Sequence, residues 1–205
     1  MRYILLLILF ESFTTLVGQN LIPNPSFEDY TLLPCRFNEF YLQDLVDHWF
    51  QPIPTTTDYW NRFSPEDCEL NPLNIGVQPR TGAGMAGIII ADIVMGNKIE
   101  YKEYIEVELS APLKPGGFYH TELYTASQPN PLYCETNNLG IAFSENRIYD
   151  FSEKHPDHLK GKPTFNEDSI IVSDGSWKKI GGCFIPDKPY KFFIAGNMIL
   201  LPISF

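Results

Sequence analysis

The stretch Tyr101-Lys-Glu-Tyr-Ile-Glu-Val-Glu-Leu109 decides the fold class, because apolar and polar side chains alternate along it. Successive side chains of a β-strand point to opposite faces, so Ile105, Val107 and Leu109 share a face that is expected to lie on a core. The other face is then expected to point outward. It carries Tyr104, Glu106 and Glu108.

Five further β-rich runs are separated by clusters of Pro, Gly and Asn, and no long helical period appears. The 17 prolines are spread along the chain, which favours a single domain with many turns over two domains and a linker. The prediction is an all-β sandwich of two stacked sheets. Its further strands are expected at 85–93, 118–126, 137–144, 177–185 and 190–197.

Two of these strands also have a predicted inner and outer face. Leu123 and Ile141, with the residues that alternate with them, are expected to face the core, whereas 85–93 is apolar enough to be covered on both sides. Residues 111–117 indicate a turn, and 145–168 indicate a long polar excursion at the surface. The predicted outward set is His120, Glu122, Tyr124, Asn138, Gly140 and Ala142.

Residues 1–18 have the layout of a secretory signal peptide, with Arg2 before an apolar run and the small Gly18 at the expected cleavage point. A buried first strand or helix is the alternative. The apolar run is too short to cross a bilayer, so no transmembrane span is expected. Residues 19–205 are then expected to form one sandwich domain that is secreted or lies on the outer cell surface.

The net charge of -10 argues against a nucleic-acid partner, because binding to phosphates needs clustered Lys and Arg side chains. An acidic surface suits a neutral ligand better than an anionic one. The charge therefore favours an uncharged partner such as a neutral glycan, or a surface protein.

Four cysteines in an exported chain are compatible with two disulfides. No Cys-x-x-Cys pair supports a zinc or thioredoxin-type site. The preferred pairing joins Cys35 to Cys68 and Cys134 to Cys183, with free, buried thiols as the alternative for the second pair.

Several motifs, taken in their order along the chain, resemble those of a known family. The N-terminal part reads Asn20-Leu-Ile-Pro-Asn-Pro-Ser-Phe-Glu28, and Arg80-Thr-Gly82, Asn137-Asn-Leu-Gly140 and Gly196-Asn-Met198 follow. The chain resembles exported proteins of Bacteroidetes-type bacteria that begin with an "NLVPNPSFE"-like strand. Their module is a jelly roll similar to carbohydrate-binding and galactose-binding-like domains. The resemblance implies this fold but no particular ligand, because function lies in the site.

The resemblance also implies a structural calcium ion between first-strand and last-strand oxygens, with Glu28 at the first-strand position. No other cofactor is expected. The chain departs from the family after Gly196, where 198–205 lack the paired Asp residues of the usual closing strand. Either 198–205 form a closing edge strand, or the chain is truncated and lacks it, which is the hypothesis adopted here.

Two places are candidate binding sites. The first is a groove on the outer faces of three strands that are expected to be neighbours, where rings would stack on sugars and polar groups would bond hydroxyls. Its residues are Tyr104, His120, Glu122, Tyr124 and Asn138. The alternative is that loops cap this sheet and the residues pack beneath them. The second site is an aromatic loop rim at Tyr59 and Trp60, beside which Trp49 is expected to lie in the core.

Enzyme signatures are missing, since no Gly-x-Ser-x-Gly elbow, His-Glu-x-x-His helix or phosphate-binding glycine loop occurs. Glu106 and Glu108 share a face, but a solvated strand explains them more simply than a glycosidase pair does. The predicted function is a non-catalytic, secreted or cell-surface module that binds carbohydrate. The alternatives are a structural or protein-interaction module of an outer-surface assembly, and a truncated product with no present role.

Overall fold

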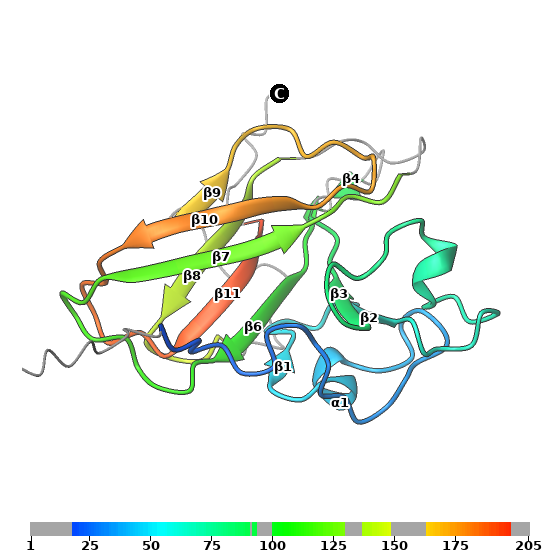
Figure 1. Ribbon diagram of the computed structural model, residues 1–205, viewed down its shortest axis with the longest axis horizontal. Helices are drawn as coiled ribbons and strands as arrows, with labels where there is room; N and C mark the ends of the chain where they lie inside the picture. Colours follow the sequence, from blue (N-terminus) through cyan, green and yellow to red (C-terminus); the bar gives the residue numbers. More distant parts are fainter. Residues whose placement is uncertain (1–17, 91, 94–99, 130–136, 149–162, 198–205) are drawn as a thin grey trace, which may run out of the picture.

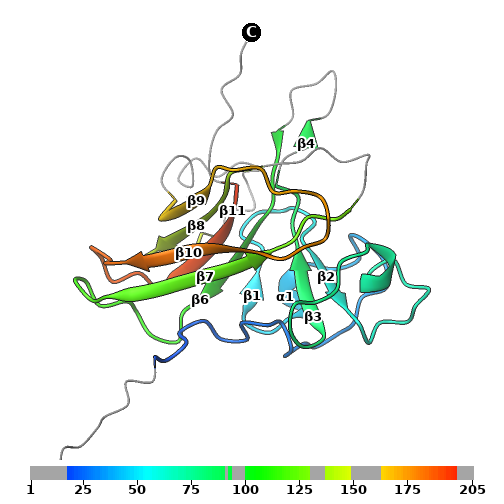
Figure 2. The same ribbon diagram turned by 45° about the horizontal axis from the view of Figure 1, so that its top comes forward.

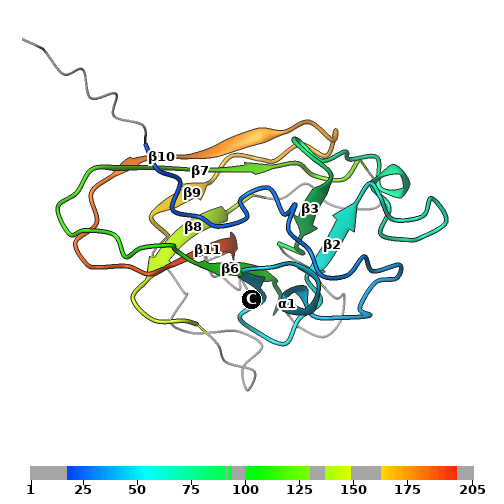
Figure 3. The same ribbon diagram turned by 60° about the horizontal axis from the view of Figure 1, so that its bottom comes forward.

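The computed structural model describes residues 18–90, 92–93, 100–129, 137–148 and 163–197. Its main body is an all-β sandwich of antiparallel sheets, as the alternating sequence predicts. One sheet has the strand order β1 (Trp49–Phe50), β6 (Tyr104–Glu108), β11 (Phe192–Asn197), β8 (Leu139–Ser144) and β9 (Phe165–Glu167). The other sheet pairs β10 (Lys178–Phe184) with β7 (Tyr119–Thr125). Figures 1 and 3 show β7 and β10 as a separate layer over the larger sheet.

A loop-rich region lies beside one end of the sandwich (Figure 2). It contains one turn of helix, α1 (Leu42–Leu45), and a strand pair formed by β2 (Asp58–Asn61) and β3 (Gly84–Gly87). The same region contains a short 3-10 helix, η1 (Pro72–Asn74). Elsewhere, a second short strand pair is formed by β4 (Asp92–Ile93) and β5 (Glu100–Tyr101). The disulfide between Cys35 and Cys68 connects two loops of the loop-rich region and confirms the predicted pairing.

The core lies between the two sheets and is rich in aromatic rings. Phe193 of β11 is 1% exposed and meets the rings of Trp49 and Phe143 edge to face, with centroids 6.3 and 5.8 Å away. Ile141 faces the same core, and Leu123 of β7 packs against it from the other sheet. The predicted inner faces are therefore confirmed, and so is the core position of Trp49.

Two predicted segments differ from the structure. The run 85–93 is not one strand, because the backbone of Ile89 bonds to Glu103 instead of to a neighbouring strand. Its N–H donates to the Glu103 carboxylate, and its carbonyl accepts from the Glu103 N–H, both at 2.8 Å. The predicted excursion 145–168 contains β9, which pairs with β8 and places Phe165 under β10.

The outward-facing side of β6 is also covered, which corrects the prediction for Tyr104 and Glu106. Both are buried, and Tyr104 forms a second apolar cluster with Ile53 and Ile148 from the adjoining loops. Alternation along β6 therefore separates two buried faces instead of a buried face and a wet one. Only Glu108, at the end of the strand, is exposed as predicted.

Several predictions fall outside the described residues: the signal peptide over 1–18, except for Gly18, the second cysteine pairing through Cys134, and the closing strand over 198–205. Within the described part of the chain, no helix is long and apolar enough to cross a membrane.

Candidate functional site

The structure does not assemble the predicted groove, because its strands are not neighbours. β11 lies between β6 and β8, and β7 belongs to the opposite sheet. The 111–117 turn does not form a hairpin. Instead it lies against the β10–β11 connection, where Leu113 N–H donates to the Tyr190 carbonyl and Gly116 N–H to the Pro186 carbonyl. Both connections thus cross from one sheet to the other at the same end of the sandwich.

Two residues of the predicted groove make hydrogen bonds to other parts of the fold. Tyr104 is 5% exposed, and its hydroxyl donates to the Asn197 carbonyl at 2.7 Å. Asn138 precedes β8 with a φ of 65°, and its Oδ1 accepts from the Asn166 amide. The small Gly140 lies under Pro163. The capped alternative therefore describes this face.

The three predicted residues of β7 do share an outer face, which the paired strand β10 extends. His120 and Glu122 are exposed, and Glu122 is 3.6 Å from the Lys179 ammonium on β10. The Arg80 guanidinium stacks on Tyr124, 3.4 Å from the ring centroid. Cys183 lies directly opposite His120, is exposed, and forms no disulfide within the described residues.

The predicted aromatic rim is part of the interior. Tyr59 is fully buried, and its hydroxyl donates to the Phe27 carbonyl at 2.9 Å. Trp60 packs with Leu70 and Met85, and a Cβ at Gly87 would overlap its ring. Both residues alternate along β2 and pack on opposite sides of it, so neither ring is available at a rim.

Glu28 joins two loops. Its Oε1 accepts from the Ala83 and Gly84 N–H groups at 2.8 and 3.1 Å, and its Oε2 accepts from Ala83 at 3.1 Å. Gly82, with a φ of 63°, leaves the space that the carboxylate fills. N–H donors suit a carboxylate but not a cation, and the described residues hold no group of three or more His, Cys, Asp or Glu side chains fit for a metal. The surroundings of Glu28 do not fit a calcium ion.

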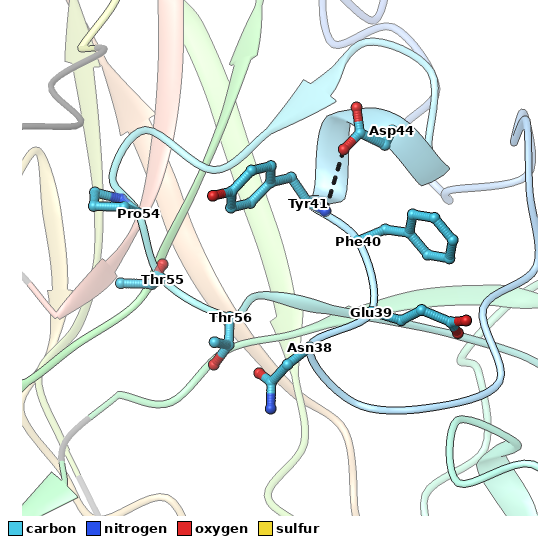
Figure 4. A pocket seen from close by; sticks show the side chains of 8 residues that line it. All are labelled: Asn38, Glu39, Phe40, Tyr41, Asp44, Pro54, Thr55 and Thr56. Atoms are coloured by element: carbon cyan, nitrogen blue, oxygen red, sulfur yellow. Dashed lines mark hydrogen bonds between the residues drawn. The ribbon is translucent and has the colours of Figure 1, made fainter.

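A pocket of about 510 Å³ lies instead between the loop before α1 and the loop after β1. Two aromatic rings beside it remain exposed, Phe40 by 41% and Tyr41 by 45%. Figure 4 shows them on opposite sides of the chain, with the Tyr41 ring directed toward Pro54. The lining residues are Asn38, Glu39, Phe40, Tyr41, Asp44, Pro54, Thr55 and Thr56.

A buried amide connects the two walls of this pocket. The Gln51 side chain is fully buried, and its Oε1 accepts from Leu42 N–H at the start of α1 at 3.2 Å. Its Nε2 donates to the Ile53 and Thr55 carbonyls of the other wall. At the rim of the pocket, Asp44 accepts from the Tyr41 N–H at 3.3 Å. These bonds hold both loops in place before any ligand arrives.

Two carboxylates lie beneath the pocket. Glu103 is 1% exposed, and its Oε1 accepts from both Thr56 N–H, at 2.8 Å, and Thr56 Oγ1, at 2.7 Å. Asp58 follows Thr56 by two residues, at the start of β2. Burial of Asp58, together with the charge of Glu103, raises the Asp58 pKa to about 7.

Sequence reasoning passed over this site because its aromatic residues lie in a loop with no alternating pattern. The available signal was the run Phe37-Asn-Glu-Phe-Tyr41, which places three rings within a few residues of a half-cystine. All three rings are exposed, unlike those of Tyr59 and Trp60. Exposed rings on a loop fixed by a disulfide are typical of binding surfaces.

Comparison with protein-family models, with curated proteins and with solved structures found no match to this chain.

Proposed function

We propose that the protein is a non-catalytic, secreted or cell-surface module that binds a neutral glycan in the pocket between Asn38–Asp44 and Pro54–Thr56. The observation that carries the proposal is an exposed ring beside side-chain oxygens: the Tyr41 ring is directed toward Pro54, and the side chains of Asn38, Asp44 and Thr56 line the same pocket. Aromatic rings stack on the apolar faces of sugars, and carboxylates, amides and hydroxyls bond their hydroxyl groups.

Charge and size support the same ligand class. Glu39 and Asp44 make the rim acidic, and the whole chain carries a net charge of -10, so an anionic glycan would be repelled. A cavity of about 510 Å³ lies within the usual range for small-ligand sites. The pocket is open enough for a chain of sugars to continue past it, since both rings are partly in solvent.

Replacing Tyr41 with Ala is expected to weaken glycan binding about tenfold, which corresponds to about 1.4 kcal/mol, because the substitution removes the ring that is directed across the pocket. The measurement is retention of the purified protein on an array of neutral polysaccharides, followed by calorimetry on a retained glycan. Phe63→Ala is the matched control, since Phe63 is an exposed Phe on the β2 side of the disulfide-bonded loops and does not line the pocket. No retention on any glycan by a protein with a β-rich circular dichroism spectrum would contradict the proposal.

We also infer that the sandwich is a jelly roll. The support is the alternation of consecutive strands between sheets: β6, β7 and β8 lie in the first, second and first sheet, and β9, β10 and β11 repeat this order. Connections that cross the sandwich in this way are typical of paired Greek keys. The same fold is used by many carbohydrate-binding modules, which agrees with the resemblance noted from the sequence.

A second candidate function, a protein-interaction module of a surface assembly, has an observation of its own. Phe118 and Ile185, just beyond the ends of β7 and β10, are 74% and 63% exposed. Large apolar side chains in solvent favour contact with another protein. Crosslinking in the cell distinguishes the two functions, because this candidate predicts partner capture and no glycan binding.

A further inference from the structure

The two threonine hydroxyls of the pocket can only accept hydrogen bonds from a ligand. The Thr56 hydroxyl donates to Glu103 Oε1 at 2.7 Å. The Thr55 hydroxyl donates to the Ile53 carbonyl at 3.4 Å. A hydroxyl has one hydrogen, so in both residues that hydrogen is already used by a group of the protein. The two oxygens therefore suit donor groups on a ligand.

The two carboxylates at the rim are acceptors as well. Asp44 Oδ2 accepts from Tyr41 N–H, and Glu39 Oε2 accepts from Cys35 N–H, both at 3.3 Å. Each bond uses one oxygen of an exposed carboxylate, so the second oxygen can accept from a ligand. The side chains of the lining that can donate are the Asn38 amide and the Tyr41 hydroxyl, and neither carries a charge.

No positive side chain lines the pocket, since none of its eight lining residues is Lys, Arg or His. Glu103 lies beneath the lining, and its charge adds to the effect of burial in raising the pKa of Asp58. Lys102, the neighbour of Glu103 in the chain, is buried and does not line the pocket. A positive group on a ligand is therefore attracted to the pocket, and a negative group is repelled.

The exposed Tyr41 ring provides a surface that suits both a sugar and a cation. The ring is directed toward Pro54, and the Tyr41 N–H is bonded to Asp44 (Figure 4). Aromatic faces stack on the apolar faces of sugars and attract ammonium groups. An ammonium group brings three donors, whereas a hydroxyl brings one donor and an N-acetyl group brings one donor with an acceptor. A sugar with an ammonium group therefore matches this lining better than a sugar with a hydroxyl in its place.

We propose that the pocket binds glycans that carry protonated amino groups more tightly than neutral glycans of the same linkage. The proposal rests on the glycan-binding function above and specifies the ligand class of that site. A neutral glycan uses the ring and the threonine oxygens. An amino glycan uses these and also places its charge beside the carboxylates of Glu39 and Asp44.

The test compares β-1,4-linked oligomers of glucose, glucosamine and N-acetylglucosamine of equal length, which differ only at carbon 2 of each sugar. Calorimetry is done at about pH 5.5, where exposed carboxylates are ionised and amino groups are protonated. The glucosamine oligomer is expected to bind about fivefold more tightly than the glucose oligomer, the upper end of what an exposed ion pair contributes. This ratio is expected to fall toward one in about 1 M salt, because salt screens exposed charges.

A matched pair of variants assigns the preference to the pocket. In Asp44→Asn the amide oxygen can still accept from the Tyr41 N–H, but the charge is gone, so the ratio of the two affinities is expected to fall. Asp67→Asn removes an exposed carboxylate that does not line the pocket, and the ratio is expected to stay at its native value. The ratio is the readout because a general loss of structure would weaken both ligands alike.

The outcomes separate this inference from the glycan proposal. Equal or weaker binding of the glucosamine oligomer, or a ratio that Asp44→Asn leaves unchanged, would overturn the inference while the glucose oligomer still supports the glycan proposal. Binding of the glucosamine oligomer alone would support the inference and contradict the choice of a neutral ligand. Binding of none of the three oligomers would overturn both.

Discussion

Replacing Glu106 with Gln is expected to raise the free energy of unfolding at about pH 8.5 by several kcal/mol and to flatten its decrease with rising pH. The Glu106 carboxyl is fully buried in β6, and this burial raises its pKa to about 8 from its ordinary value of 4.5. Its Oε1 accepts from Ile148 N–H at 2.9 Å. Its Oε2 is buried and has no hydrogen-bond partner among the described residues.

The sign follows from the direction of the shift. The unfolded chain loses this proton near pH 4.5, whereas the folded protein keeps it up to about pH 8. The stabilising contribution is therefore fully present below pH 4.5 and is lost as the pH rises to about 8. The pKa difference corresponds to an upper bound on the order of 3–5 kcal/mol. Gln keeps the shape and cannot ionise, so its stability does not carry this dependence.

Urea unfolding at about pH 5.5 and at about pH 8.5 measures the effect. Glu108→Gln is the matched control, since Glu108 lies two residues along the same strand and is exposed. It is expected to change the free energy of unfolding by less than about 0.5 kcal/mol at either pH. Equal pH dependence in Glu106→Gln and in the native protein would show that Glu106 is not a buried acid.

Replacing Phe193 with Ala is expected to cost about 3–5 kcal/mol of stability, the usual range for a large ring removed from a well-packed core. Phe193 is 1% exposed in β11, the central strand of the five-stranded sheet. It contacts Trp49 and Phe143 by edge-to-face packing, so its loss leaves a cavity and two rings without a partner. Thermal or urea unfolding at fixed pH provides the measurement.

Phe118→Ala tests whether the loss depends on the core. Phe118 undergoes the same chemical change but is 74% exposed, so the expected loss is within about 0.5 kcal/mol. Similar losses for Phe193→Ala and Phe118→Ala would contradict the packing of the two sheets described above.

The sequence predicts strands well where one side chain in two is apolar. The inner faces around Leu123, Ile141 and Ile105 are confirmed, because burial of one face fixes the register. The same argument fails for the other face of β6. Tyr104 and Glu106 are polar enough to suggest solvent, yet Tyr104 bonds to the Asn197 carbonyl, and burial raises the pKa of Glu106 to about 8. Loops that cover a sheet leave no periodic signal in the strand itself.

Strand neighbours are harder to predict than strands. A Pro- and Gly-rich turn over 111–117 is compatible with a hairpin, and nothing in its composition shows that it crosses between sheets. Its partner, the connection after β10, lies some 70 residues away in the chain, as the bond from Gly116 N–H to the Pro186 carbonyl shows. Because the groove required β6, β7 and β8 to be neighbours, it failed when β7 was found in the other sheet.

The exposed rings beside the pocket are not the ones that the sequence singled out. Rings and oxygens do meet at a loop, but the rings are those of Phe40 and Tyr41, and Tyr59 and Trp60 are buried. Which aromatic side chains are buried depends on how the loops pack on one another. Here the disulfide and the side chain of Gln51 hold loops together, and neither contact between loops is visible in the sequence.

In the proposed function the loop pocket binds the ligand, and the outer face of β7 and β10 does not. Amide chemical-shift mapping of the protein with a neutral oligosaccharide tests it most directly. The expected result is saturable shifts confined to the amides of residues 38–44 and 55–56 and their immediate neighbours. Saturable shifts centred on His120, Glu122 and Tyr124, with the pocket amides unchanged, would contradict it.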